Sequence, residues 1–245
     1  MKKPNKYEIS AILLVFCVIS VYFFLPDVAK WKTKNPLTTQ YIELRKQEAL
    51  LAKKDFNLQW TWISLRQIPA HFIYAVMYTE DSRFLEHKGF DLDRIYAAFK
   101  MMWKEKKFIV GASTITQQTA RNLYLSPEKT IWRKILEISI AIKLELFLTK
   151  ERILEIYLNC AEWGDGIFGV EAAAQYWFHC SASQLNLEQS VRLVLNLRCP
   201  LLRKPTQNSV FFNKEINYLI LTLAEQQIIS RKTACTALVD LQALR

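Results

Sequence analysis

The chain has 245 residues, 51% of them hydrophobic, and its 33 Lys and Arg outnumber its 23 Asp and Glu for a formal net charge of +10. This is enough for one sizeable domain with its own core, and the low counts of 5 Gly and 7 Pro argue against extended low-complexity or disordered segments. The positive balance predicts an anionic partner, which charge alone leaves open among nucleic acid, an acidic membrane surface and a phosphorylated substrate.

An uncharged apolar segment occupies residues 9–25. At about 1.5 Å per residue it spans roughly 26 Å, slightly short of the roughly 30 Å hydrocarbon core of a bilayer. A cleaved signal peptide is the rival interpretation, but the run exceeds the usual signal core and no small-x-small pair follows it cleanly. We therefore expect an uncleaved transmembrane anchor at 9–25, after a cytoplasmic tail at 1–8. Flanking charge hardly sets its orientation, since these lysines lie on both sides: Lys2, Lys3, Lys6, Lys30, Lys32 and Lys34.

Residues 26–59 are expected to form a juxtamembrane connector, with a polar helix over 39–54. From Trp60 onward one helical pattern follows another, and alternating strand patterns are scarce. Pro69 suits the first turn of a helix that runs toward Tyr78. The expected fold is therefore a single, mainly α domain over residues 60–245.

Farther along, Ser126-Pro127-Glu128 predicts a helix start. Ser126 can cap the helix, Pro127 has a φ angle already fixed for the first helical position, and Glu128 places an acidic side chain in the first turn. Isoleucines then recur at helical spacing: Ile131, Ile135, Ile138 and Ile142. Thr149 can cap a further helix, and three glycines at 164, 166 and 169 mark an irregular turn before a helix from about Glu171. A C-terminal helix near 211–229 is expected to close the domain.

Ionisable groups gather where the helix through Tyr78 ends, in the string from Thr79 to Gly89 (TEDSRFLEHKG). A carboxylate at the end of an apolar helix can be partly desolvated, which raises its basicity and suits a general base. Taken alone, such a cluster is more often an ordinary solvated helix end.

A second string, from Gly111 to Asn122 (GASTITQQTARN), is rich in hydroxyl, amide and guanidinium groups and has no acidic residue. These groups bind phosphate or sugar oxygens, Gly111 allows close approach of the backbone, and the amides at a helix start favour an anion. A capped polar helix is the plainer alternative, but the full string favours a binding segment.

A third string places Arg133 and Glu137 four residues apart on one helix face. A surface salt bridge would explain this pair at little energetic gain. In a functional site, Arg133 would grip a diphosphate bidentately, Lys134 would add a point charge, and Glu137 would orient these cations or help to hold a divalent ion.

The fourth string runs from Lys150 to Asn159 (KERILEIYLN) and continues over 162–174 (EWGDGIFGVEAAA). Its aliphatic residues Ile153, Leu154 and Leu158 predict core, while Glu155 and Asn159 share a face that could brace a site from beneath. Its glycines do not indicate a dinucleotide site, because no strand precedes them and their spacing is wrong.

The cysteines and histidines show no metal-binding spacing. No CxxC pair occurs and the three His are dispersed, so a zinc site is not expected. Isolated buried thiols are favoured, with pairing in an oxidising compartment left open, for the four cysteines outside the apolar segment: Cys160, Cys180, Cys199 and Cys235.

Taken in this order, the four strings resemble the peptidoglycan glycosyltransferase family (glycosyltransferase family 51), the module found in class A penicillin-binding proteins and their stand-alone relatives. The resemblance covers about residues 60–205. It implies a lysozyme-like helical head lobe and a smaller, membrane-proximal jaw lobe, here expected to include residues 99–110, whose apolar side chains are interleaved with lysines. Because the chain stops at Arg245, the monofunctional form without a transpeptidase domain is expected.

The resemblance implies polymerisation of a lipid-linked disaccharide-pentapeptide (lipid II) into glycan strands, with inversion and release of polyprenyl diphosphate. Glu80 matches the catalytic base, which would deprotonate the sugar 4-hydroxyl, and Glu137 matches a second catalytic glutamate at the donor diphosphate. The other binding-site positions that it implies are Asp81, Phe84, Ser113, Thr114, Gln117, Gln118, Arg121, Asn122, Arg133, Lys134, Tyr157 and Asn159.

The family further implies assistance from a divalent cation, Mg²⁺ or Mn²⁺, that the protein does not bind tightly. Its expected partners are lipid II, the growing glycan strand, the membrane and other cell-wall synthesis proteins, with the catalytic domain on the outer face of the inner membrane. Diphosphate leaves readily once its charge is neutralised, so one base and a cationic cradle suffice, unlike the two carboxylates of most glycosidases. Nucleic-acid binding has no motif behind it.

Three features depart from the family pattern: Ala112 stands where a second Gly is common, Arg121 replaces the usual Lys, and residues 194–200 lack the usual small-residue, proline-bounded pattern. Two other functions stay open. A lysozyme-like glycan hydrolase would not need the diphosphate-binding cluster, because a neutral glycan carries no such charge. A non-catalytic membrane scaffold fits less well, because the acidic and basic positions of the family are all present.

Overall fold

The computed structural model describes residues 25–105, 113–128 and 130–243. Over these residues the chain is mainly α-helical, as the sequence predicted. Its helical elements, with η for a 3-10 helix, are in chain order η1 (Ala29–Lys32), α2 (Gln40–Leu51), η2 (Leu65–Gln67), α3 (Ala70–Asp81), α4 (Leu92–Glu105), α5 (Ile115–Tyr124), α6 (Ile131–Phe147), α7 (Lys150–Cys160), α8 (Val170–Phe178), η3 (Ala182–Gln184), α9 (Leu187–Asn196), α10 (Val210–Glu225) and α11 (Arg231–Ala243).

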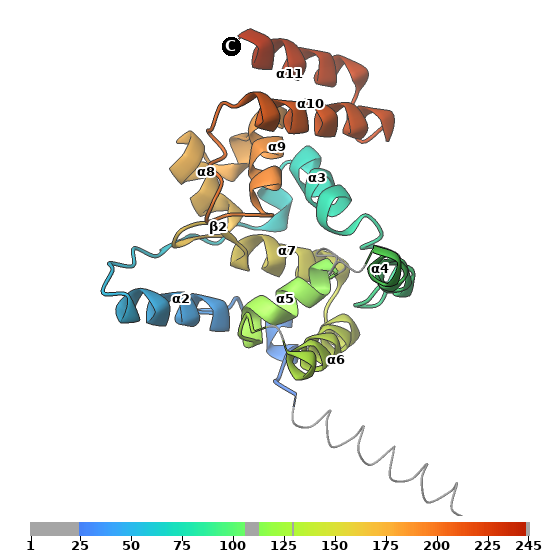
Figure 1. Ribbon diagram of the computed structural model, residues 1–245. Coiled ribbons are helices and arrows are strands. Elements are labelled where there is room, and N and C mark those ends of the chain that lie inside the picture. The colour runs from blue at the N-terminus through green and yellow to red at the C-terminus, as the bar shows by residue number, and fades with distance from the viewer. Residues whose placement is uncertain (1–24, 106–112, 129, 244–245) are drawn as a thin grey trace, which may run out of the picture.

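Helix α7 lies at the centre of the domain, and α5 packs between α7 and α6 (Figure 1). The predicted core residues of α7 are confirmed, since Ile153 and Leu158 are fully buried and Leu154 is 3% exposed. Burial of such a side chain stabilises a fold by about 1.5–3 kcal/mol. Thr149 caps α7 as predicted, with its side chain accepting a hydrogen bond from the backbone N–H of Arg152.

A small sheet joins the start of the domain to its middle. Its strands β1 (Gln59–Trp60), β2 (Glu162–Gly164) and β3 (Ile167–Phe168) lie in the order β1-β3-β2, with β1 parallel and β2 antiparallel to β3. The turn between β2 and β3 is the glycine-rich turn that the sequence predicted. Gly166 has a φ of +73° there, and a Cβ would meet the carbonyl oxygen of Asn57 at 2.8 Å, so the turn requires glycine.

The predicted helix start at Ser126-Pro127-Glu128 is wrong. These residues lie in an irregular segment before α6, whose N-cap is Thr130, with the Thr130 Oγ1 accepting from the backbone N–H of Arg133 at 3.2 Å. Both Ser126 and Thr130 carry a capping hydroxyl, so the local pattern does not choose between them. In the structure the cap is Thr130, and the helix that it starts packs against α5.

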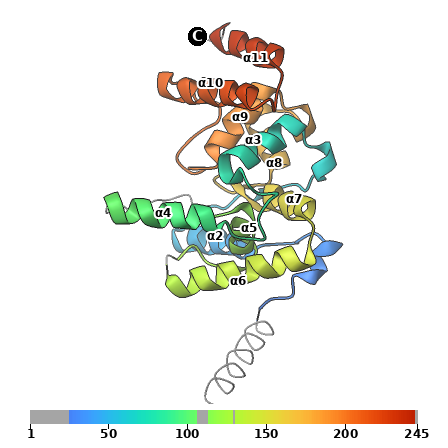
Figure 2. The ribbon, with the colours of Figure 1, turned by 90° about the vertical axis from the view of Figure 1, so that its right-hand side faces the viewer.

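The C-terminal region holds one helix more than the sequence predicted. Helix α10 ends at Glu225, and a turn in which Gln227 has a φ of +57° leads into α11. These two helices form one end of the molecule, whereas α6 and the blue N-terminal segment with η1 lie at the opposite end (Figures 1 and 2). Helix α4 projects from the side of the body (Figure 2).

The segment expected as a connector, 26–59, packs on the domain. Its residues Val28 and Ile42 are fully buried, and α2 lies against α5. In the parts of the chain that the structure describes, no helix combines the length and the apolar character needed to cross a membrane. The predicted anchor at 9–25 lies, apart from Leu25, outside the described residues, and the expected jaw segment 99–110 lies partly on α4 and partly outside them.

The four cysteines outside the apolar segment are free thiols in the structure. The expected burial is confirmed for Cys160 and is wrong for the other three, because Cys180 and Cys199 are partly exposed and Cys235 is exposed. Burial raises the pKa of the Cys160 thiol, so it stays protonated and behaves as a core residue.

Candidate active site

The Asp81 side chain links the end of α3 to the start of α5 through hydrogen bonds. Its carboxylate is buried, and its Oδ2 accepts hydrogen bonds at 2.9 Å from the backbone N–H of Ile115 and from Nε2 of His87. Its Oδ1 lies 3.4 Å from Nη1 of Arg94, which also donates to the carbonyl oxygen of Glu80 at 3.0 Å. This binding-site candidate is therefore engaged with protein groups, and it fixes the position of its neighbour, Glu80.

Glu80 is half-buried in the last turn of α3, where its Oε2 accepts from Nε2 of Gln118 at 3.0 Å. The amide oxygen of Gln118 accepts from the Tyr157 phenol at 3.4 Å. Burial, followed by the negative charge of Glu80, raises the pKa of Tyr157 well above its ordinary value. Tyr157 therefore stays protonated and donates, which turns the NH₂ group of Gln118 toward Glu80.

A cationic cluster forms where the first turns of α6 meet the start of α5. The buried Glu137 is ion-paired with both Arg133 and Lys134. Lys134 Nζ also donates to Ser113 Oγ at 2.7 Å and to Gln117 Oε1 at 3.4 Å. Two cations around one carboxylate leave a net positive charge, which suits an anionic ligand.

Helix α5 joins the two halves of the site. Its consecutive residues Gln117 and Gln118 contact Lys134 and Glu80, respectively. Thr114 caps this helix, since its Oγ1 accepts from the Gln117 N–H at 3.2 Å and donates to the Gly89 carbonyl oxygen at 2.7 Å. Thr114 and Gln117 therefore form a capping box at the start of α5. The side-chain amides of Gln117 and Gln118 are directed toward two different partners.

Other candidates lie in supporting positions. Phe84 is buried beneath the Lys150 ammonium, 4.4 Å from the ring centroid, and Asn122 is 8% exposed on α5. The Asn159 amide is engaged with the backbone of Ile63, accepting from its N–H at 2.8 Å and donating to its carbonyl at 2.9 Å. Arg121 is half-buried, and its charge opposes the rise in the pKa of Tyr157, which places it near that phenol.

Sequence reasoning missed two features of the site. Arg94 reaches Glu80 and Asp81 from α4, and Glu145 near the end of α6 accepts from Thr116 Oγ1 at 2.6 Å and from Lys150 Nζ at 2.7 Å. The contacts of Arg94 with Glu80 and Asp81, and of Thr116 with Glu145, join residues 13 to 29 positions apart, so local spacing could not have revealed them. Glu145 forms an ion pair with Lys150 across the break between α6 and α7.

The residues do not fit a resident divalent cation. No group of three or more His, Cys, Asp or Glu side chains within the described residues is placed to hold one. Both oxygens of Glu137 are ion-paired with cations, which would repel a metal ion at that carboxylate.

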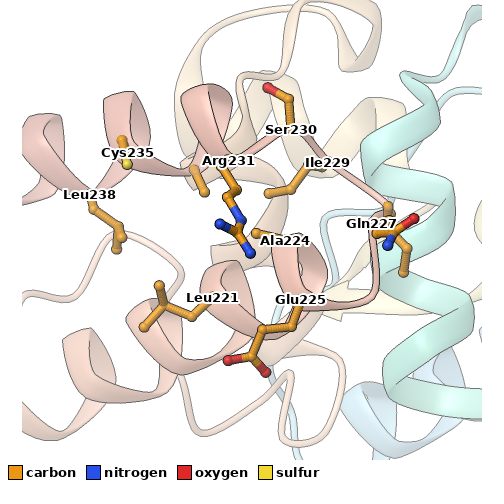
Figure 3. A pocket seen from close by; sticks show the side chains of 11 residues that line it. Leu221, Ala224, Glu225, Gln227, Ile229, Ser230, Arg231, Cys235 and Leu238 are labelled. Carbon is orange, nitrogen blue, oxygen red and sulfur yellow. The ribbon is translucent and has the colours of Figure 1, made fainter.

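A cavity of about 730 Å³ lies away from these residues, between α10 and α11 (Figure 3). It is lined mostly by apolar groups, and Figure 3 shows the Arg231 side chain reaching from α11 toward α10. None of the candidate site residues lines it, and Glu225 is its one carboxylate. Its size therefore does not make it the reaction centre.

A positioned carboxylate beside a cationic cluster, in a mainly α domain, suits an enzyme that transfers a sugar from an anionic leaving group. The chain matches the transglycosylase family model over residues 47–224 and therefore belongs to that family. It is an enzyme, a peptidoglycan glycosyltransferase.

Relatives along most of the chain support this assignment. The biosynthetic peptidoglycan transglycosylase of Nitrosomonas eutropha is 44% identical over 182 residues, 74% of this chain and 75% of the relative. The protein of that description from Nitrosospira multiformis is 37% identical over 218 residues, 88% and 95% of the two chains. The one from Cupriavidus metallidurans is 37% identical over 237 residues, 96% and 98% of the two chains.

Proposed function

We propose that this glycosyltransferase polymerises lipid II into glycan strands, with Glu80 as the general base. Glu80 takes the proton from the 4-hydroxyl of the incoming disaccharide, and that oxygen bonds to the anomeric carbon of the growing strand. The bond from this carbon to the diphosphate breaks, and polyprenyl diphosphate leaves with the electron pair. Attack opposite the leaving group inverts the anomeric centre.

The position of Glu80 supports its role as base. The Gln118 amide fixes the plane of the Glu80 carboxylate, and Arg94 holds the backbone of the same residue. A general base must be held within hydrogen-bond reach of the proton that it removes. Behind Gln118, the Tyr157 phenol donates to the amide oxygen at 3.4 Å and so helps to hold that amide in place.

The cationic cluster supports the binding of a diphosphate by Arg133 and Lys134. The Nε of Arg133 is buried and has no hydrogen-bond partner among the described residues, and buried donors are rarely left in this state. An anionic oxygen of the substrate would satisfy it. The observation that carries the proposal is that α5 contacts Glu80 and Lys134 through adjacent amides, so that the base and the cations adjoin one helix.

The family resemblance supports the finer features of the proposal. We expect a lysozyme-like head lobe and a membrane-proximal jaw lobe, an anchor at 9–25, and a catalytic domain on the outer, periplasmic face of the inner membrane, where the precursor is used. Other cell-wall synthesis proteins are expected partners. Any Mg²⁺ or Mn²⁺ is expected to come with the diphosphate, because the described part of the chain places no three His, Cys, Asp or Glu side chains together as a cation site.

The test uses full-length protein in detergent with magnesium and fluorescent lipid II, analysed on a gel. We expect a glycan ladder that muramidase erases, and a rate lowered by about 10²–10⁴-fold in Glu80→Gln with lipid II binding retained. Glu86→Gln is the matched control, because Glu86 is an exposed carboxylate six residues farther along the same segment.

Other results would point to the rival functions. A folded protein that binds lipid II but makes no ladder would be a scaffold. Release of short soluble glycans from preformed strands would indicate a hydrolase. A Glu80→Gln variant as active as Glu86→Gln would remove Glu80 from the role of base.

A further inference from the structure

Glu145 is a buried carboxylate for which the proposed chemistry has no role. It lies in the last turn of α6, its side chain is 4% exposed, and it forms an ion pair with Lys150 at the start of α7. Burying a carboxylate is costly in free energy unless the group is paired and hydrogen-bonded. The contacts that offset this cost all lead toward the site of the proposed base.

The first contact of Glu145 is with α5. Its Oε1 accepts from Thr116 Oγ1 at 2.6 Å, and Thr116 is fully buried. Thr116 follows Ile115, whose backbone N–H donates to Asp81 Oδ2 at 2.9 Å. It precedes by two residues Gln118, the amide that contacts the base. Glu145 therefore holds the first turn of α5 where this helix meets the end of α3.

The second contact leads to the loop that follows the base. The same Oε1 accepts from Lys150 Nζ at 2.7 Å, and this ammonium lies 4.4 Å from the centroid of the Phe84 ring. Phe84 is 1% exposed, and its backbone N–H donates to the carbonyl oxygen of Asp81 at 2.9 Å. An ammonium is attracted to the face of an aromatic ring, and the attraction grows where water is largely excluded. Glu145 thus fixes Lys150, and Lys150 covers Phe84.

The same loop also packs directly on α6, at Gly89. This residue has a φ of +93°, and a Cβ there would meet the Ala141 carbonyl oxygen at 3.2 Å and Glu145 Cγ at 3.3 Å. The Gly89 carbonyl oxygen accepts from Thr114 Oγ1, in the cap of α5, at 2.7 Å. The loop is therefore held between the Glu145 side chain on one side and the start of α5 on the other.

We propose that Glu145 is a positioning residue for the reaction, which aligns Glu80 with the Gln118 amide. It does so by joining the loop after Glu80, the first turn of α5 and the start of α7 around one buried charge. This inference rests on the proposed role of Glu80 as the base. Glu145 acts through Thr116 and Lys150, and it takes no part in the proton transfer itself.

The negative charge of Glu145 is what this task requires. Hydrogen bonds between charged groups are shorter and stronger than those between neutral ones. A neutral amide at position 145 would still accept from Thr116 but would no longer attract the ammonium of Lys150. Lysine has a flexible four-carbon stem, so without its partner Lys150 would turn toward water and uncover Phe84.

The first experiment measures kcat and KM of Glu145→Gln in the lipid II polymerisation assay. We expect kcat to fall by about fivefold or more while KM stays within about twofold, because the alignment of the base changes and the groups that bind lipid II do not. Glu188→Gln is the matched control, since Glu188 is 11% exposed, is paired with Arg192, and lies on α9, which carries none of the candidate site residues.

Both variants are assayed below their melting temperatures, which are measured alongside. The control is expected to lose stability as Glu145→Gln does, but to keep kcat within about twofold of the wild type. Equal kcat values for the two variants, or a rise in KM with kcat unchanged, would overturn the positioning role.

Two further variants separate positioning from folding. Glu145→Asp keeps a carboxylate within reach of the flexible Lys150, and its kcat should exceed that of Glu145→Gln by about threefold or more. Thr116→Val keeps the ion pair but removes the link to α5, and should lower kcat by about threefold or more. If Glu145→Gln does not fold, Thr116→Val decides. A wild-type kcat in Thr116→Val, or a Glu145→Asp variant as slow as Glu145→Gln, would contradict the proposal.

Glu80→Gln is measured in the same assay, so that the two proposals can fail separately. A wild-type protein that makes no ladder, or a Glu80→Gln variant with the wild-type rate, would remove the proposed function and the inference that rests on it. A Glu145→Gln variant with the wild-type rate, beside an inactive Glu80→Gln, would remove the positioning role alone.

Discussion

Tyr157 shows how one buried hydroxyl can orient a side chain that it does not touch, here Glu80, the proposed base. Its phenol donates to the Gln118 amide oxygen, and the same amide donates to Glu80. A Gln side chain can present either its oxygen or its nitrogen, and only the nitrogen attracts a carboxylate. The protonated phenol selects this orientation, because burial and the charge of Glu80 raise its pKa.

Tyr157→Phe should therefore lower kcat for polymerisation by roughly 2–10-fold, the equivalent of one hydrogen bond of about 0.5–1.5 kcal/mol, with KM for lipid II unchanged. Steady-state rates over a range of lipid II concentrations test this. Tyr176→Phe is the control, because Tyr176 is 47% exposed on α8. An equal kcat for the two variants would show that Gln118 does not need the phenol.

At the scale of a single element, the start of α6 decides where the cationic cluster lies. Thr130 caps the helix through the N–H of Arg133, the residue that pairs with Glu137 one turn farther along. Helix ends that lose such a cap leave a backbone donor without a partner. The cap thus stabilises both the start of the helix and Arg133, the first residue of the proposed diphosphate-binding cluster.

Thr130→Ala is expected to lower the free energy of unfolding by about 1 kcal/mol, within the 0.5–2 kcal/mol range for lost caps. Ser126→Ala should change it by less than about 0.5 kcal/mol, because Ser126 lies outside the helix. Urea unfolding of the two variants, followed by circular dichroism, gives both values. A larger loss for Ser126→Ala than for Thr130→Ala would place the helix start at the earlier residue.

At the scale of the whole molecule, the contact between α3 and α9 is expected to respond to pH through His71. His71 on α3 lies with Nε2 at 3.2 Å from the Leu185 carbonyl oxygen and at 3.0 Å from Ser190 Oγ, beside α9. Burial lowers the pKa of His71, and its hydrogen bonds to the backbone oppose this only in part. The unfolded chain therefore binds a proton more readily than the folded one below the ordinary pKa of about 6.5.

The free energy of unfolding should consequently fall as the pH decreases from 7 to 5, and His71→Gln should weaken this dependence. Chemical unfolding at several pH values measures both slopes. His179→Asn is the control, since His179 is exposed and asparagine tolerates its φ of +55°. Equal slopes for the wild type and His71→Gln would assign the pH dependence to other groups.

The sequence by itself determined the helical class and much of the element order, because caps and apolar spacing act over a few residues. It also placed Thr149 as the cap of α7, and Ile153, Leu154 and Leu158 in the core. The family was recognisable for a related reason. Its four motifs are short strings of residues, and their composition and order can be read without knowing which residues are in contact.

Only the tertiary structure decided which groups within those strings meet. The Asn159 amide braces Ile63 from 96 positions away, and Gln117 and Gln118, although adjacent, contact different halves of the site. The start of α6, the existence of α11 and the outward turn of the apolar face of α6 were equally hidden. The physical reason is that periodicity predicts a helix with an apolar face, whereas the neighbour that covers this face is set by packing between distant segments.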